Sequence, residues 1–197
     1  MNRRTFCSLM MAVAANVCLF GCTSRPGAIS YSRDVRSAGQ PGLPSPNAIV
    51  VFDSWSGNTK AIAETMAQSL GCAAMPVDEA FAPSMGEYDL LLVGSPVHGG
   101  MPTGKIERFL SEIEVPRASA VFVTYGAPLF GPHTANTCLD SMAEKLGGTC
   151  FGTFKCHGFH QIFRTYPDHP DETDRADATR FATGLLERCC SGVRALA

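Results

Sequence analysis

Short apolar runs alternate along this chain with stretches whose apolar residues recur every three or four positions. The runs are rich in aliphatic, β-branched and aromatic residues, which is typical of strands. Five such runs lie at residues 48–52, 73–77, 89–94, 120–124 and 149–155. The 89–94 run is continuously apolar in its centre, as expected of a strand that is covered on both faces. Alternation of this kind predicts a parallel sheet with helices on both sides.

The stretches between the runs predict four helices. They lie at residues 58–70, 106–113, 135–146 and 173–188. Gly71 is expected to end the first helix, and Asp171 or Thr173 to cap the last one. In such folds ligands bind beyond the carboxyl ends of the strands, where the connections change direction. The residues that follow each strand are therefore the candidates for a site.

The N-terminal segment has a different character from the rest of the chain. Arg3 and Arg4 precede an uncharged apolar run at 9–20, and this predicts a signal peptide over residues 1–21. The Arg-Arg-x-Phe pattern resembles a twin-arginine export signal. That route carries proteins already folded around a cofactor.

The segment that follows predicts a membrane anchor and a linker. Leu-Phe-Gly-Cys ending at Cys22 resembles a bacterial lipobox, so Cys22 is expected to carry lipid. Residues 22–47 are rich in Pro, Gly, Ser and Arg, the composition of a flexible tether. We therefore expect the folded domain, residues 48–197, to be exported and held on the periplasmic or extracytoplasmic side of a membrane.

Charge and cysteine usage exclude several classes of protein. The chain has 16 Lys+Arg against 18 Asp+Glu and no basic stripe, which argues against nucleic acid as a partner. Of its nine cysteines, six lie beyond Cys22, without a convincing disulfide or metal pattern. Cys156, His157 and His160 are close in sequence, but no second Cys/His cluster accompanies them. We expect no metal site there, and a buried thiol at Cys156.

A polar loop joins the first strand directly to the first helix. The backbone N–H groups at a helix N-terminus lack partners and lie at the positive end of the helix dipole, so they can hold a phosphate without a lysine. Gly57 would let the backbone close on the anion. The polar residues expected to bind the phosphate are Ser54, Ser56, Asn58 and Thr59. A plain helix cap would use the same residue types.

The Ser-Trp-Ser-Gly-Asn-Thr segment, between a strand and a helix, resembles the phosphate loop of flavodoxins. The resemblance continues through 88–102, 152–158 and 169–171, and it covers essentially all of 48–188. It implies an α/β fold, a three-layer doubly wound sheet of five parallel strands in the flavodoxin-like order 2-1-3-4-5. It also implies noncovalent binding of FMN.

By the same resemblance, two further loops form the walls of a flavin pocket. The second loop, 95–100, contributes Pro96, Val97, His98, Gly99 and Gly100. The third loop, 125–131, contributes Tyr125, Gly126 and Phe130. His98 either borders the flavin or faces solvent, and Tyr125 either faces the ring or packs in the core.

Two residues of the phosphate loop depart from the commonest flavodoxin pattern. Asp53 stands where a small residue is usual, and we expect it to face solvent or to cap neighbouring backbone. Trp55 is the only tryptophan; it either covers the ribityl chain or flavin edge, or packs on an adjacent loop.

The first functional hypothesis is an FMN-binding, flavodoxin-like redox protein that transfers electrons near the membrane, with a redox protein or a small molecule as partner. No catalytic triad or carboxylate pair is suggested, so the chemistry is expected to be the cofactor's. Loss of residues 1–21 removes two cations and no acid, which leaves the chain only mildly acidic and steering toward a basic partner weak. The alternatives are an FMN-dependent oxidoreductase acting on a quinone or porphyrinogen, and a flavin-free binding domain of the same fold.

Overall fold

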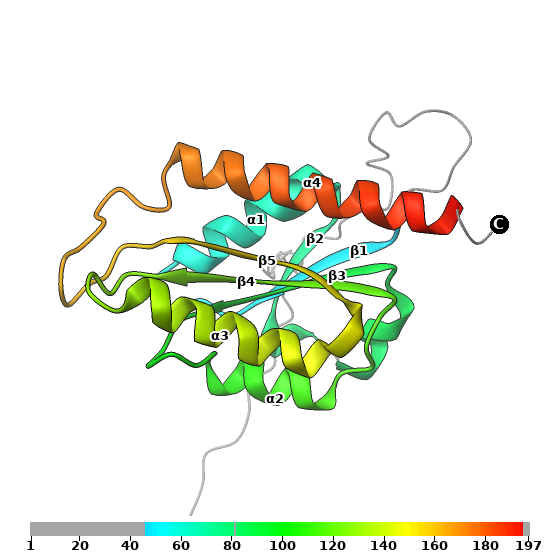
Figure 1. The fold of residues 1–197 in the computed structure, drawn as a ribbon, viewed down its shortest axis with the longest axis horizontal. Coiled ribbons are helices and arrows are strands. Elements are labelled where there is room, and N and C mark those ends of the chain that lie inside the picture. The colour runs from blue at the N-terminus through cyan, green and yellow to red at the C-terminus, as the bar shows by residue number, and fades with distance from the viewer. Residues whose placement is uncertain (1–45, 81, 195–197) are drawn as a thin grey trace, which may run out of the picture. The chain divides into compact units, whose positions relative to one another are not determined.

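The computed structural model describes residues 46–80 and 82–194. This part of the chain contains a sheet of five parallel strands in the order β2-β1-β3-β4-β5 (Figure 1), which confirms the predicted fold class. The strands are β1 (Ala48–Phe52), β2 (Ala73–Pro76), β3 (Leu90–Pro96), β4 (Ala118–Tyr125) and β5 (Cys150–His157). The predicted signal peptide, the lipidation site at Cys22 and nearly all of the tether lie outside the described residues.

Two helices cover each face of the sheet, which gives three layers (Figure 1). One face carries α1 (Asn58–Leu70) and α4 (Glu172–Arg194), and the other carries α2 (Gly104–Glu112) and α3 (Gly131–Leu146). Short 3-10 turns occupy Val77–Glu79, Ala82–Glu87 and Gly147–Thr149. No helix within the described ranges is both long enough and apolar enough to cross a membrane.

Alternate residues of each central strand supply the two cores. In β1, Ile49 and Val51 pack in the core under α2 and α3, whereas Val50 and Phe52 pack in the core under α1 and α4. All four are buried, as the continuous apolar pattern predicts for a strand covered on both sides. Burial of apolar side chains on both faces, at about 25 cal/mol per Å², is the main stabilising term of such a sheet.

Two central strands run further than their apolar runs predicted. β3 extends through Ser95 and Pro96, which the sequence had placed in the second loop. Ser95 is fully buried, and its hydroxyl accepts a hydrogen bond from Thr103 N at 3.0 Å and donates one to Pro96 O at 2.9 Å. The hydrogen bond from Thr103 N thus satisfies a hydroxyl at a buried strand position that an apolar side chain usually occupies. Pro96 is the last residue of its strand, where its missing N–H costs little.

The thiols and one predicted helix cap agree with the sequence, whereas α3 begins four residues before its predicted start and α4 ends six residues after its predicted end. Asp174 N donates to Asp171 Oδ1 at 2.9 Å, so Asp171 is the N-cap of α4, one of the two residues expected there. All six cysteines in the described part are free thiols, and Cys156 is buried as expected. Burial raises the pKa of both Cys72 and Cys138 to about 12, so these groups stay protonated.

Gly94 leaves room in β3 for the ring of Phe122, its neighbour in β4. A Cβ atom at Gly94 would lie 2.1 Å from that fully buried ring. Gly94→Ala should therefore lower the free energy of unfolding by about 1–3 kcal/mol in chemical denaturation. Gly148→Ala, where nothing lies within 4 Å, is the matched control. Repeating Gly94→Ala in a Phe122→Leu background should shrink the loss, and an equal loss in both backgrounds would contradict this packing.

Candidate functional site

The loop between β1 and α1 presents an open helix N-terminus at the carboxyl edge of the sheet. Gly57 has a φ of 88°, the left-handed conformation that glycine adopts readily, and it precedes the first helical residue. The N-cap residue, Gly57, has no side chain to cap this end, although Lys60 N donates to Ser54 Oγ, and the first turn of α1 contains no acidic residue. The other backbone donors of the first turn and the positive end of the helix dipole are therefore available to an anion.

The polar side chains of this loop have separate roles. Ser54 Oγ accepts a hydrogen bond from Lys60 N at 3.2 Å, and Ser56 Oγ accepts one from Asn58 Nδ2 at 3.0 Å. Thr59 is buried, and its hydroxyl lies 2.9 Å from that of Thr124 in β4. Thr59 therefore fastens the start of α1 to the sheet and offers a ligand only its backbone N–H. Both serine hydroxyls accept in these bonds, so each keeps a proton to donate.

Of the two expectations for Asp53, the one that it faces solvent is wrong. Its side chain is buried, and Oδ1 accepts a hydrogen bond from Ser54 N at 2.9 Å, so the expected backbone-capping role is confirmed. Oδ2 is buried without a hydrogen-bond partner among the described residues. A buried carboxylate oxygen without a donor is costly, and a hydroxyl or N–H group of a ligand would satisfy it.

The second loop lies beside the first through an aromatic contact. His98 and Met101 exchange two backbone hydrogen bonds, of 2.9 and 3.0 Å, around Gly99 and Gly100, which have φ values of 59° and 88°. The Trp55 ring meets the His98 ring edge-on, with centroids 4.8 Å apart. Trp55 thus packs on the adjacent loop while 64% of it stays exposed. Pro96 and Val97 lead from β3 into this turn.

The third loop separates its two aromatic candidates. Tyr125 is buried at the end of β4, in the core under α2 and α3, as the second of its two predicted alternatives has it. Burial raises the pKa of its phenol. Phe130 is 67% exposed and free to contact a ligand. Glycine at position 126 lets the chain after β5 approach the third loop closely, because a Cβ there would lie 2.6 Å from His160 Cβ and 2.7 Å from Gly158 O.

The segment between β5 and α4, residues 158–171, also borders these loops, and sequence reasoning missed it. Asn58 Nδ2 donates to Phe159 O at 3.0 Å, which joins the segment to the phosphate loop. Thr165 Oγ1 donates to Gly126 O at 2.5 Å, which joins it to the third loop. The density of aromatic and histidine residues between 157 and 169 was the available signal.

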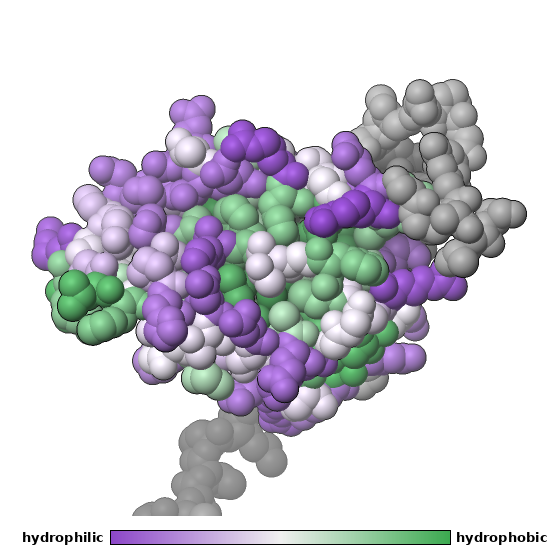
Figure 2. Space-filling model, in the orientation of Figure 1, coloured by the Kyte–Doolittle hydropathy of each residue, from purple (hydrophilic) through white to green (hydrophobic). Residues whose placement is uncertain are grey.

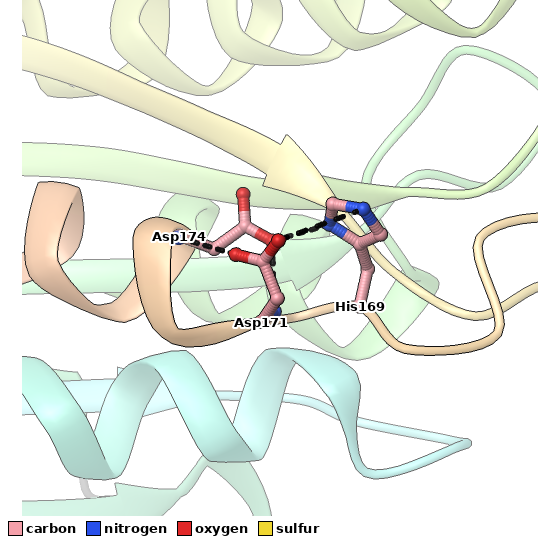
Figure 3. A group of neighbouring side chains, drawn as sticks. All are labelled: His169, Asp171 and Asp174. Carbon is pink, nitrogen blue, oxygen red and sulfur yellow. Dashed lines mark hydrogen bonds and ion pairs between the residues drawn. The ribbon is translucent and has the colours of Figure 1, made fainter.

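An aromatic stack and a helix cap hold the two ends of this segment. His157 stacks on Tyr166 with centroids 3.9 Å apart and lies 5.4 Å from the ring of His169. His169 Nδ1 lies 2.6 Å from Asp174 Oδ2 (Figure 3), and that oxygen also accepts from Asp171 N at 3.0 Å. Both carboxylates thus take part in capping α4, and the Asp174 backbone N–H holds the pKa of Asp171 below its ordinary value.

Among the histidine, cysteine and acidic residues within the described ranges, one group has ligand atoms close enough together to hold a metal ion: His169, Asp171 and Asp174. Its hydrogen bonds are those of a helix cap. Cys156, His157 and His160 are not part of it.

The comparisons with known proteins agree with this geometry. Residues 49–165 match the family described as Flavodoxin domain. An uncharacterized protein of Methanocaldococcus jannaschii is 30% identical over 137 residues, which is 66% of this chain and 91% of that protein. A flavodoxin from the domain Archaea has a TM-score of 0.56 at 20% identity, over 72% of this chain and 97% of that one. Oxidised Flavodoxin 2 from Bacillus cereus has a TM-score of 0.52 at 21% identity, over 72% and 99%.

His157 makes stability depend on pH. Burial, and then the neighbouring His169, lower its pKa, although Asp174 opposes them. Below the unfolded-state value of about 6.5 the unfolded chain binds a proton more readily than the folded one, so the free energy of unfolding falls as pH drops.

His157→Phe keeps a ring against Tyr166 and removes the titration. Denaturation at about pH 7.5 and about pH 5 should therefore show a smaller decline in this variant than in the wild type. His133→Phe, at an exposed position in α3, should decline as the wild type does. Equal declines in all three proteins would exclude His157 as a source of the pH dependence.

Proposed function

The chain belongs to the flavodoxin domain family, whose cofactor is FMN, and from this premise we propose that it is a redox protein that transfers electrons close to a membrane. The observation that carries the proposal is the N-terminus of α1 at the carboxyl edge of the sheet, where the N-cap residue is a left-handed glycine, Gly57, without a capping side chain. An acid-free helix start with a glycine at its N-cap, beside two serine hydroxyls, is a site for a phosphate group.

The residues of this edge fit FMN in three respects. The first turn of α1 and the hydroxyls of Ser54 and Ser56 would hold the phosphate. The orphaned oxygen of Asp53 would accept a hydrogen bond from a hydroxyl of the ribityl chain, which gives this unusual acid a reason to be buried. The exposed apolar surfaces of Trp55 and Phe130 would be covered by a flat ring.

The protein's own groups bind, orient and shield in this proposal. FMN, when bound, supplies the capacity to accept and donate electrons. The peptide groups of Gly99 and Gly100 offer hydrogen bonds at the second loop, and so does the His98 ring. The segment 158–171 braces the third loop through Gly126. No protein side chain need act as nucleophile or general base.

A second candidate is an FMN-dependent oxidoreductase that acts on a quinone or a porphyrinogen. The segment 158–171 favours it, because this segment stands beside the proposed flavin loops and is long enough to contact a substrate. Anaerobic mixing with NAD(P)H and a quinone analogue separates the two candidates. Reduction with turnover supports the enzyme, and reduction without turnover supports the electron carrier.

Export and membrane attachment are part of the proposal. The Arg3-Arg4 signal and Cys22 support them, as does the composition of residues 22–47. Expression in a bacterial host with radiolabelled palmitate tests the anchor. Wild-type chain should be labelled and recovered with membranes, Cys22→Ala should lose the label, and Cys72→Ala is the matched control.

The visible spectrum of the purified full chain tests the redox proposal directly. We expect a yellow protein, or a colourless one that quenches flavin fluorescence on titration with FMN. Protein that is colourless and quenches nothing would reject both redox candidates and favour the flavin-free binding domain.

Ser56→Ala should weaken FMN binding about 5–30-fold, the equivalent of roughly 1–2 kcal/mol for one hydrogen bond to a charged phosphate. The serine hydroxyl retains a proton to donate because its oxygen accepts from Asn58. Fluorescence titration with FMN measures the change. Ser111→Ala, at an exposed position in α2, should bind FMN as the wild type does. Unchanged affinity in Ser56→Ala would place the phosphate elsewhere.

A further inference from the structure

We propose that the segment between β5 and α4 docks on an anionic lipid bilayer through an apolar tip. The apolar tip consists of Ile162 and Phe163 in this segment and Leu129 in the loop after β4. Their exposed fractions are 84%, 61% and 80%. Figure 2 shows strongly hydrophobic residues gathered at the end of the domain where Figure 1 draws this segment.

The tip is held outward by the structure beneath it. His160 N donates to Thr165 O at 3.1 Å, which closes a short hairpin. Phe163 N donates to His160 Nδ1 at 3.2 Å, and the rings of these two residues lie 4.6 Å apart. The base of the hairpin is fastened to Gly126. A hairpin whose backbone is already held by such hydrogen bonds loses less conformational entropy than a free loop when its apolar side chains enter a membrane interface.

The charge around the tip suits an anionic surface. Residues 115–139 and 145–167 include no aspartate or glutamate, although the whole chain has a net charge of −2. Asp168, which is exposed, is the first acid after the tip and follows it by five residues. Arg164 directly follows Phe163 of the tip and is exposed. Lys155 lies in β5, the strand that leads into this segment. Anionic lipid headgroups attract such cations, whereas the same cations would repel a basic protein partner. A protruding apolar tip with adjacent cations is a pattern of interfacial membrane binding.

The chain that precedes β1 is long enough to permit this orientation. In a parallel sheet β1 begins at the edge opposite to the carboxyl ends of β4 and β5, where the tip lies. Residues 22–47 can span at most about 85 Å, against roughly 26 Å for a strand of the length of β5. The inference relies on the proposed tether for the nearness of the bilayer, and it does not depend on FMN.

A tryptophan at the tip tests the proposal. In a Trp55→Phe background, which removes the only native tryptophan, Phe163→Trp is compared with Phe151→Trp. Phe151 is the second residue of β5, at the opposite edge, and is 50% exposed. The full chains are reconstituted with vesicles of phosphatidylcholine and phosphatidylglycerol, with and without brominated acyl chains. Flotation records attachment and the FMN titration records cofactor binding, each separately from the probe.

We expect brominated lipid to quench Phe163→Trp emission about twofold, with a blue shift, and to leave Phe151→Trp unchanged. Absent or equal quenching of the two probes overturns the proposal, whether or not the protein floats and whether or not it binds FMN.

An anionic-lipid requirement is tested with Arg164→Glu in the Phe163→Trp chain, which should need about fivefold more vesicles for half-maximal quenching. Arg117→Glu, exposed at the start of β4, should have no effect. An Arg164→Glu result equal to that control would overturn the charge argument.

Discussion

Parallel pairing of β1 between β2 and β3 is the constraint on which the rest of this structure depends. Because all five strands point the same way, every loop that follows a strand lies at one edge of the sheet. The chain leaves β1 for β2 on one side, and β3 returns to the other side of β1. The loops after β1 and β3 therefore diverge, and ligands bind at this switch point in open α/β sheets. The N-terminus of α1 lies there, so the fold itself places backbone donors at the edge where we propose that the phosphate binds.

The site is assembled by contacts between residues that are far apart in the chain. Thr59 meets Thr124 across 65 positions, and Asn58 reaches Phe159 across 101. Gly126 admits the segment after β5 because any side chain there would collide with it. These contacts couple the phosphate loop, the third loop and the segment 158–171 into one unit. Short polar links, each of about 1 kcal/mol net, align loops that the two apolar cores have already brought together.

Polar and apolar groups divide the carboxyl edge between two roles. Near the switch point, donors at α1 and the unpartnered Asp53 oxygen offer polar contacts, flanked by the exposed rings of Trp55 and Phe130. Further along, beyond β4 and β5, large apolar side chains protrude and stay more than half exposed. In our proposals the first region binds FMN and the second meets the membrane, which would place an electron-transfer site close to lipid-soluble acceptors.

The amino-acid sequence alone determined the fold class, the strand order through the family resemblance, and the glycine-led start of the first helix, where we propose that the phosphate binds. It could do so because apolar periodicity and the glycine before α1 are local properties of the chain. It did not determine that Ser95 lies within a strand, that Tyr125 is buried, or that Asp53 is enclosed with one oxygen unpaired. Those outcomes depend on which distant backbone approaches each side chain. For the same reason the segment 158–171 became part of the site only in the tertiary structure: its hydrogen bonds to Asn58 and Gly126 form after the sheet has brought the ends of β1, β4 and β5 to one edge.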